Sequence, residues 1–273
     1  MKRDWPSSGE PAGGPAPTTL IDIVFPGDTN HHGTLFGGTG LALMDRVAFI
    51  AATRYGRVPL VTRSCERVDF KKPARIGEIL EFTARPVWAG RRSLTIEVEM
   101  VAEAIVRRER HVCTRGIFHM VAMPDGDRAA DWSLPSLSDV AQDTGQANLK
   151  MVEIVFADQA NSVGKMFGGE AIAYMTKAAF VAASRQSGKL TVLASSERID
   201  FKRPIEVGEI VEVEAKVTQI GRTSMTVETV LRAENLLTGE NHVTARGSFL
   251  MVAVGPDHRP TPVIPNDLDA SPS

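Results

Sequence analysis

Apolar and polar side chains alternate along several segments of this chain. Residues 94–100 follow the alternation, and residues 211–217 repeat it. A period of two with one polar face is typical of antiparallel strands. The glycine-containing segments 89–91 and 220–222 predict hairpin turns next to these strands.

The spacing of the apolar residues becomes helical from Gly38, and a matching segment follows later in the chain. The positions that share one helical face are Leu41, Met44, Ala48 and Ala51 in the first segment and Ile172, Met175, Ala179 and Ala182 in the second. Each predicted helix spans about 15 residues and ends near Gly56 or Gly188. Before Arg54, only Asp45 and Arg46 carry charge in the first helix, so we expect it to be mostly buried.

The matching segments belong to a duplication. Residues 36–38, Phe-Gly-Gly, recur 131 positions later as residues 167–169. When residues 23–123 are laid on 154–254 without any gap, roughly 44 of the 101 pairs are identical. Solenoid repeats have periods of roughly 20 to 50 residues, so a period this long indicates two complete domains.

We therefore divide the chain into two domains and their connectors. Residues 1–20 are expected to form a disordered lead-in, 21–123 the first domain, 124–152 a polar linker, 153–254 the second domain and 255–273 a Pro-rich tail. Each domain contains a strand, a loop, one apolar helix and about four long strands. The predicted fold class is α+β, with one antiparallel sheet wrapped round one helix in each repeat.

Composition narrows the class of partner and the compartment. A net charge of -2 with 43% hydrophobic residues is typical of soluble globular proteins and implies neither a nucleic-acid nor a membrane partner. The N-terminus lacks the apolar region of a secretory signal. Cys65 and Cys113 are replaced in the second repeat by Ser196 and Thr244, which favours small buried residues over a disulfide. We therefore expect a cytoplasmic protein.

The residues before the first helix carry a family resemblance. Residues 25–38 read FPGDTNHHGTLFGG and are followed by Met44 and Asp45. This string is similar to that of acyl-CoA thioesterases of the cytosolic acyl-CoA hydrolase and bacterial short-chain hydrolase group, and the resemblance covers both repeats nearly end to end. It implies a double hotdog fold that hydrolyses fatty acyl-CoA between its two repeats, without a cofactor, and assembles as a homotrimer of double hotdogs.

Thioester hydrolysis requires a group that activates water or attacks the carbonyl, and donors for the developing oxyanion. Asp28 is the first candidate for the general base or nucleophile, because its counterpart Gln159 can be neither. By resemblance, Asn161 of the other loop completes this site, while Gln159 with Asn30 forms an inactive or merely binding one. We therefore expect one active site per chain. The alternative role for Asp28 is that of a turn or cap residue.

Asp45 is the second catalytic candidate. A related group of thioesterases uses an acidic residue seven positions after the second glycine, and Asp45 stands seven positions after Gly38. Thr176 replaces it in the second repeat. A carboxylate on so apolar a helix is expected to be paired or functional, and the alternative to catalysis is a structural hydrogen bond.

Other residues are candidates for binding the substrate. Glycines at a helix start let a thioester approach free backbone N–H groups, and the candidates are Gly37, Gly38, Gly168 and Gly169. Long cations can bind the phosphates of CoA, and the candidates near strand ends or hairpins are Lys71, Lys72, Arg91, Arg92, Lys202, Arg203 and Arg222. For each of these cations the alternative is a solvated strand edge.

Three other interpretations compete with hydrolysis. A hotdog hydratase would carry a histidine five positions after Asp28, where this chain has Gly33. The alternative from outside the enzymes is a sensor protein that binds acyl-CoA without catalysis. A metal site at His31 and His32 is disfavoured because the second repeat has Ser162 and Val163 there. The repeated pair His111 and His242 is expected to be structural.

Overall fold

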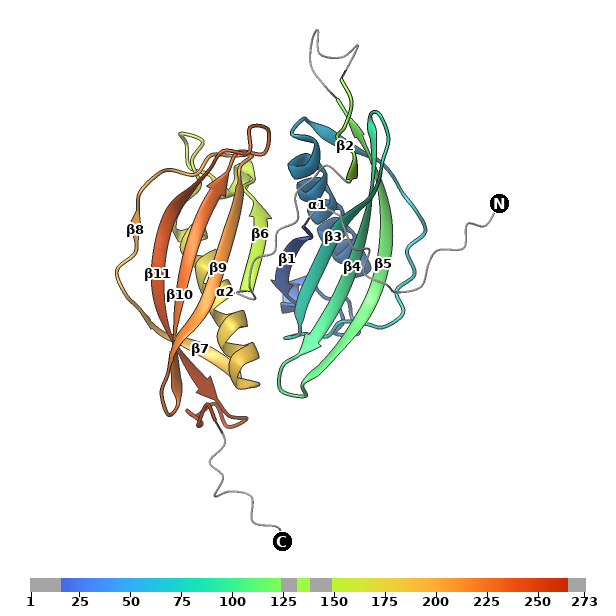
Figure 1. The fold of residues 1–273 in the computed structure, drawn as a ribbon. Coiled ribbons are helices and arrows are strands. Elements are labelled where there is room, and N and C mark those ends of the chain that lie inside the picture. Colours follow the sequence, from blue (N-terminus) through green and yellow to red (C-terminus); the bar gives the residue numbers. More distant parts are fainter. Residues whose placement is uncertain (1–15, 124–131, 138–148, 265–273) are drawn as a thin grey trace.

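The computed structural model describes residues 16–123, 132–137 and 149–264 (Figure 1). Most of the predicted lead-in and much of the predicted linker and tail lie outside these ranges. Neither helix in the described part of the chain has the length and hydropathy that a membrane span requires.

The first repeat is one antiparallel sheet curled round one helix. Its elements are β1 (Thr18–Ile23), the 3-10 turn η1 (Pro26–Asp28), α1 (Gly37–Gly56), β2 (Leu60–Cys65), β3 (Ile79–Ala89), β4 (Ser93–Ala104) and β5 (Glu109–Ala122). The strand order is β1-β3-β4-β5-β2. Residues 90–92 connect β3 to β4, so the predicted hairpin is confirmed.

The second repeat follows the same plan. Its elements are β6 (Leu149–Ile154), η4 (Ala157–Gln159), α2 (Gly168–Ser187), β7 (Leu190–Ser196), β8 (Asp200–Phe201), β9 (Ile210–Ile220), β10 (Ser224–Glu234) and β11 (Asn241–Val254). The sheet has the order β6-β9-β10-β11-β7, with β8 paired to β11. The predicted α+β architecture of two sheets, each around one helix, is thereby confirmed.

Both helices are longer than the sequence predicted, at 20 residues each. Each ends at a left-handed residue, Arg57 with φ 50° and Gly188 with φ 66°, which is a common way to terminate a helix. Met44 is fully buried, whereas Leu41 on the same predicted face is 37% exposed. The neighbouring Gly40 and Leu43 are buried, whereas Asp45, one turn on from Leu41, is partly exposed, so Leu41 lies at the margin of the buried face.

Apolar contacts join the two repeats in matching pairs. Ile50 of α1 packs in a cluster with Val152, Ile154, Ile210 and Leu236 of the second repeat. In return, Ile21, Ile79 and Ile105 of the first repeat belong to the core cluster that contains Val181 of α2. With the offset of 131, Ile50 corresponds to Val181, and the other partners correspond likewise. The repeats therefore share a pseudo-twofold apolar interface, where β1 and β6 lie side by side (Figure 1).

The predicted domain boundaries need correction. β1 begins at Thr18 and β6 at Leu149, so both domains start before the predicted residues 21 and 153. Within the predicted linker, Leu134 is buried against the first core, and the Tyr55 hydroxyl donates to the Pro135 carbonyl at 2.5 Å. Val263 of the predicted tail is also buried. Apolar residues in these connectors extend the two cores.

The two cysteines differ in environment. Cys113 is buried as expected, and burial raises the pKa of its thiol to about 11. Cys65 is exposed, because β2 is an edge strand in which only Leu60 is buried. The expectation of a buried residue was therefore wrong for Cys65. Both thiols are free.

We predict that Met44→Ala lowers the free energy of unfolding by about 2–5 kcal/mol, because it opens a cavity between α1 and the sheet. Leu41→Ala, the matched control, should cost less than about 1 kcal/mol, since Leu41 is already partly hydrated. Urea unfolding of the two variants measures both values. Equal losses would show that the helix packs differently.

Candidate active site

The loop after β1 is closed by hydrogen bonds around Asp28. The Phe36 N–H donates to the Asp28 carbonyl at 2.8 Å, which holds this loop against the start of α1. The Asp28 carboxylate accepts a hydrogen bond from the Phe25 N–H at 3.3 Å. The turn-and-cap alternative for Asp28 is therefore present in the structure.

Gln159 makes the same contacts in the second repeat. Its carbonyl accepts from the Phe167 N–H at 2.9 Å, and its side-chain oxygen accepts from the Phe156 N–H at 3.0 Å. Both a carboxylate and a carboxamide thus serve the turn. The exchange of Asp28 for Gln159 keeps these hydrogen bonds and replaces a negatively charged side chain with a neutral, longer one.

The two loop asparagines differ in how many amide N–H donors their side chains have free. Asn30 accepts from the His32 N–H at 2.9 Å and donates one of its two amide hydrogens to the Thr34 hydroxyl at 3.0 Å. Asn161 accepts from the N–H groups of Val163 and Lys165 at 3.0 and 3.1 Å. Within the described residues its amide NH₂ has no partner, so Asn161 retains donors that a bound carbonyl can accept.

Asp45 is paired with a residue that sequence reasoning missed. The Thr62 hydroxyl of β2 donates to the Asp45 carboxylate at 2.7 Å, and Asp45 remains partly accessible to solvent. Thr176 and Leu193 occupy the equivalent positions, and the Thr176 hydroxyl donates instead to its own helix at the Ile172 carbonyl, at 2.8 Å. The acid and its hydroxyl partner therefore occur once per chain. The second repeat lacks both residues, and this joint absence is the sequence signal that could have pointed to Thr62.

Contacts across the interface decide which loop faces which helix. Arg46, next to Asp45 on α1, pairs with Glu153 at 3.3 Å, and its guanidinium lies 4.8 Å from the Phe156 ring. The loop that leads to Asn161 therefore begins against the middle of α1. Burial raises the pKa of the Glu153 carboxyl, although Arg46 acts in the opposite direction.

The reciprocal contact assigns the first loop to the other helix. Lys177 of α2 pairs with Asp22 at 2.6 Å, and Asp22 precedes the Asp28 loop. Among the residues that the structure describes, no hydrogen bond or ion pair joins Asp28 to Asn161. These contacts place the start of the Asn161 loop on the side of α1, which carries Asp45, and the pair of Asp28 with Asn161 stays a prediction.

A pocket of about 400 Å³ adjoins Asn161. It is lined by Asn161, Lys165, Met166, Gly168, Ala171, Phe201, Lys202, Arg203, Pro204 and Ile205. Three cations meet apolar side chains here, although Lys165 is already paired with Glu206. Of the predicted binding residues, the structure thus brings together Asn161, Gly168 and two of the cations.

The remaining candidates are distributed over other surfaces. Gly37 and Gly38 form the first turn of α1, as Gly168 and Gly169 do in α2. Lys71 and Lys72 are exposed on the segment that follows Phe70, whose ring packs close to Gly37. The hairpin cations Arg91, Arg92 and Arg222 lie at the far end of their own sheets from the loop, because β3 and β9 each extend over 11 residues, about 35 Å.

The histidines have ordinary surroundings. His31 and His32 are exposed, with ring centroids 3.9 Å apart, and no group of three or more potential metal ligands occurs among the described residues. His111 lies 3.1 Å from the Pro73 carbonyl, a contact that fits a structural role. Its counterpart His242 buries a ring nitrogen without a partner.

Comparison with known proteins identifies the family. The model of the thioesterase superfamily matches residues 32–107 and 163–240, once in each repeat and over more than half of the chain. The chain therefore belongs to the thioesterase superfamily. A crystal structure of an acyl-CoA hydrolase from Agrobacterium tumefaciens is 69% identical, with a TM-score of 0.82, and the alignment covers 91% of this chain and 99% of that one. The expected double hotdog fold is confirmed.

Curated relatives carry related names. The uncharacterized acyl-CoA thioester hydrolase YkhA of Bacillus subtilis is 35% identical over 100 residues, which cover 37% of this chain and 58% of YkhA. Acyl-coenzyme A thioesterase 11 of Mus musculus is 23% identical over 268 residues, 83% of this chain and 45% of that protein. The chain thus spans less than two thirds of either relative. The resemblance to acyl-CoA thioesterases with tandem hotdog domains is confirmed.

The hydrogen bonds at positions 28 and 159 predict a small, specific effect on stability. Gln159→Ala removes the acceptor for the Phe156 N–H and should lower the free energy of unfolding by about 0.5–1.5 kcal/mol. Gln159→Asp keeps an acceptor, as Asp28 does in the first repeat, and should change stability less. Thermal unfolding of the two variants tests this, and an unaffected Gln159→Ala variant would refute the role of the cap.

Proposed function

We propose that this protein hydrolyses fatty acyl-CoA to the free acid and CoA, at a site between its two repeats. The observation that carries the proposal is the hydrogen bond between Thr62 and Asp45, which occurs once per chain on the helix that faces the Asn161 loop. Membership in the thioesterase superfamily and the names of the relatives support the reaction class.

In the proposed reaction the Asp45 carboxylate is the general base. It accepts a proton from water as the water oxygen attacks the thioester carbonyl carbon and forms a tetrahedral oxyanion. Collapse of this intermediate breaks the C–S bond, and the leaving CoA thiolate takes the proton from Asp45, which yields the free acid and CoA. Thr62 fixes the orientation of the carboxylate through its hydroxyl. Asn161 donates its free amide N–H to the carbonyl oxygen, where negative charge develops.

Asp45 is the better candidate than Asp28 on structural grounds. The Asp28 side chain serves its own turn, and Gln159 performs that task without a carboxylate. Asp28 also belongs to the loop that lies on the side of α2, where Thr176 stands in place of an acid. The alternative is that Asp28 is the general base or nucleophile, and the Asp28→Asn variant tests it.

The pocket beside Asn161 provides for the CoA part of the substrate. Lys202 and Arg203 supply positive charge for phosphate oxygens, and Met166 and Ile205 supply apolar surface. Gly168, at the start of α2, lets the ligand approach the backbone closely. Lys71, Lys72, Arg91, Arg92 and Arg222 remain predictions as CoA-binding residues, as do Gly37, Gly38, Gly169 and Asn30 at the loops.

The cellular form of the enzyme is part of the same proposal. We expect a cytoplasmic homotrimer of double hotdogs, as the family resemblance implies, and a reaction that requires only water and the acyl-CoA substrate. Size-exclusion chromatography with light scattering measures the assembly directly.

We predict that Asp45→Asn lowers kcat for acyl-CoA hydrolysis by about 10²- to 10⁴-fold, because the amide cannot accept the proton from water. Asp28→Asn should retain kcat within about threefold, since an amide oxygen supports the turn as Gln159 does. Release of free CoA thiol from a series of acetyl- to palmitoyl-CoA substrates measures both. Loss of activity in Asp28→Asn alone would reverse the assignment.

The role of Thr62 yields a separate prediction. Thr62→Val should lower kcat by roughly 10- to 150-fold, because a hydrogen bond to a charged group contributes about 1.5–3 kcal/mol. Thr62→Ser retains the hydroxyl and is the matched control, with kcat close to that of the original chain. If both variants lost activity equally, packing of the side chain rather than its hydrogen bond would be responsible.

A further inference from the structure

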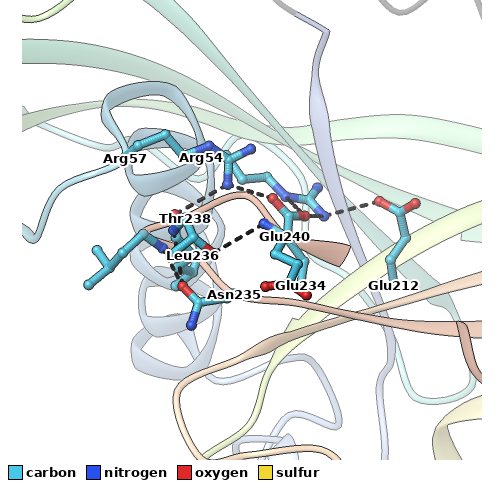
Figure 2. Close-up of polar contacts among 9 residues, drawn as sticks. Arg54, Arg57, Glu212, Glu234, Asn235, Leu236, Thr238 and Glu240 are labelled. Carbon is cyan, nitrogen blue, oxygen red and sulfur yellow. Dashed lines mark hydrogen bonds and ion pairs between the residues drawn. The ribbon is translucent and has the colours of Figure 1, made fainter. Parts of the chain in front are cut away.

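Two arginines join the repeats through matching acidic pairs. Arg54, near the end of α1, contacts Glu212 at 3.1 Å and Glu234 at 2.6 Å (Figure 2). Arg185 of α2 contacts the equivalent residues of the first repeat, Glu81 at 2.7 Å and Glu103 at 2.6 Å. All these side chains are at most one quarter exposed. This part of the interface follows the pseudo-twofold symmetry.

The second arginine at each acidic pair breaks that symmetry. Arg57 extends from the end of α1 to Glu234, at 2.7 Å, and to the Leu236 carbonyl, at 3.2 Å (Figure 2). The equivalent position on α2 is Gly188, which has no side chain to reach across. On that side Arg110 of β5 contacts Glu81 and Glu103 from within the first repeat, and its own counterpart is Asn241.

A second exchange of arginine and glycine accompanies the first. A Cβ atom on Gly239 would lie 3.0 Å from the Arg57 guanidinium carbon, and one on Gly188 would lie 2.8 Å from the Arg108 guanidinium. Arg108 corresponds to Gly239, just as Arg57 corresponds to Gly188. In each contact, therefore, an arginine of the first repeat lies over a glycine of the second repeat.

The backbone does not dictate this choice of residues. Arg57 and Arg108 have φ of 50° and 54°, and Gly188 and Gly239 have φ of 66° and 74°. All four positions are left-handed, a conformation that glycine adopts more easily than arginine. Arginine is nevertheless present at one member of each equivalent pair, so its contacts across the interface compensate for the backbone cost.

Pairing of identical repeats would lose this complementarity. If two first repeats met in the same geometry, each acidic pair, Glu81 with Glu103, would face Arg54 and Arg57 of the other copy beside its own Arg110. Arg57 would then also meet Arg108 where it now meets Gly239. If two second repeats met, Arg185 alone would face Glu212 and Glu234, and glycine would lie over glycine. Excess positive charge disfavours the first arrangement, and two partly buried carboxylates that share one arginine disfavour the second.

We propose that these positions make the interface selective for unlike repeats, so that a first repeat recognises a second repeat and rejects another copy of itself. The selective residues are Arg57, Arg108 and Arg110 in the first repeat and Gly188, Gly239 and Asn241 in the second. This selection keeps α1, with Asp45, against the loop that carries Asn161. It concerns pairing alone and stands whether or not the proposed hydrolysis is correct.

The test exchanges the selective residues in the full-length chain. The variant G188R/G239R/N241R gives both halves the first-repeat set, and R57G/R108G/R110N gives both the second-repeat set. Each triple variant should lower Tm by roughly 3 °C or more. The sixfold variant that combines them restores unlike pairing with the halves interchanged, and its Tm should recover at least half of the larger loss.

The sixfold variant keeps the proposal open to refutation even where a triple variant fails to fold. Independent sites would give it a loss of Tm close to the sum of the two triple losses, and that additive result would overturn the proposal. G188A/G239A is the control, because it introduces left-handed strain at both positions without a guanidinium. Should this control lower Tm as much as G188R/G239R/N241R, strain rather than charge pairing would be the cause.

Discussion

The apolar contact between the two repeats is the constraint on which the rest of the structure depends. Ile50 fills an apolar cluster of the second repeat, and residues of the first repeat enter the cluster around Val181 in return. The apolar contact sets the two repeats side by side, and the partly buried ion pairs of Arg54 and Arg185 fix their relative position.

That arrangement supplies two equivalent frameworks for a site, and the side chains make them different. The turns at Asp28 and Gln159 have the same hydrogen bonds, and both helices begin with two glycines. Only α1 carries an acid with a hydroxyl partner, whereas both loop asparagines keep at least one amide N–H free among the described residues. The duplication thus preserved the backbone of both frameworks, and the proposed chemistry belongs to one of them.

Much of this could be predicted from the sequence, because local patterns determine it. The duplication, the helix starts and the alternating strands are visible in the order of residues. The exposure of Cys65 follows from the edge position of β2, which no local pattern reports. Thr62 gained significance only when folding placed its hydroxyl 2.7 Å from Asp45. Long-range contacts of this kind require the tertiary structure.

The most direct test of the central claim, that one of two equivalent frameworks carries the chemistry, is the transfer of the Asp45–Thr62 pair to the other repeat. The double variant Asp45→Thr with Thr62→Leu should lose acyl-CoA hydrolysis. Adding Thr176→Asp with Leu193→Thr should restore it. Acyl-CoA turnover of the two variants is the measurement. The account predicts recovery to within about tenfold of the original kcat, roughly 1.4 kcal/mol in the barrier. Turnover that stays at the level of the double variant Asp45→Thr with Thr62→Leu would contradict it.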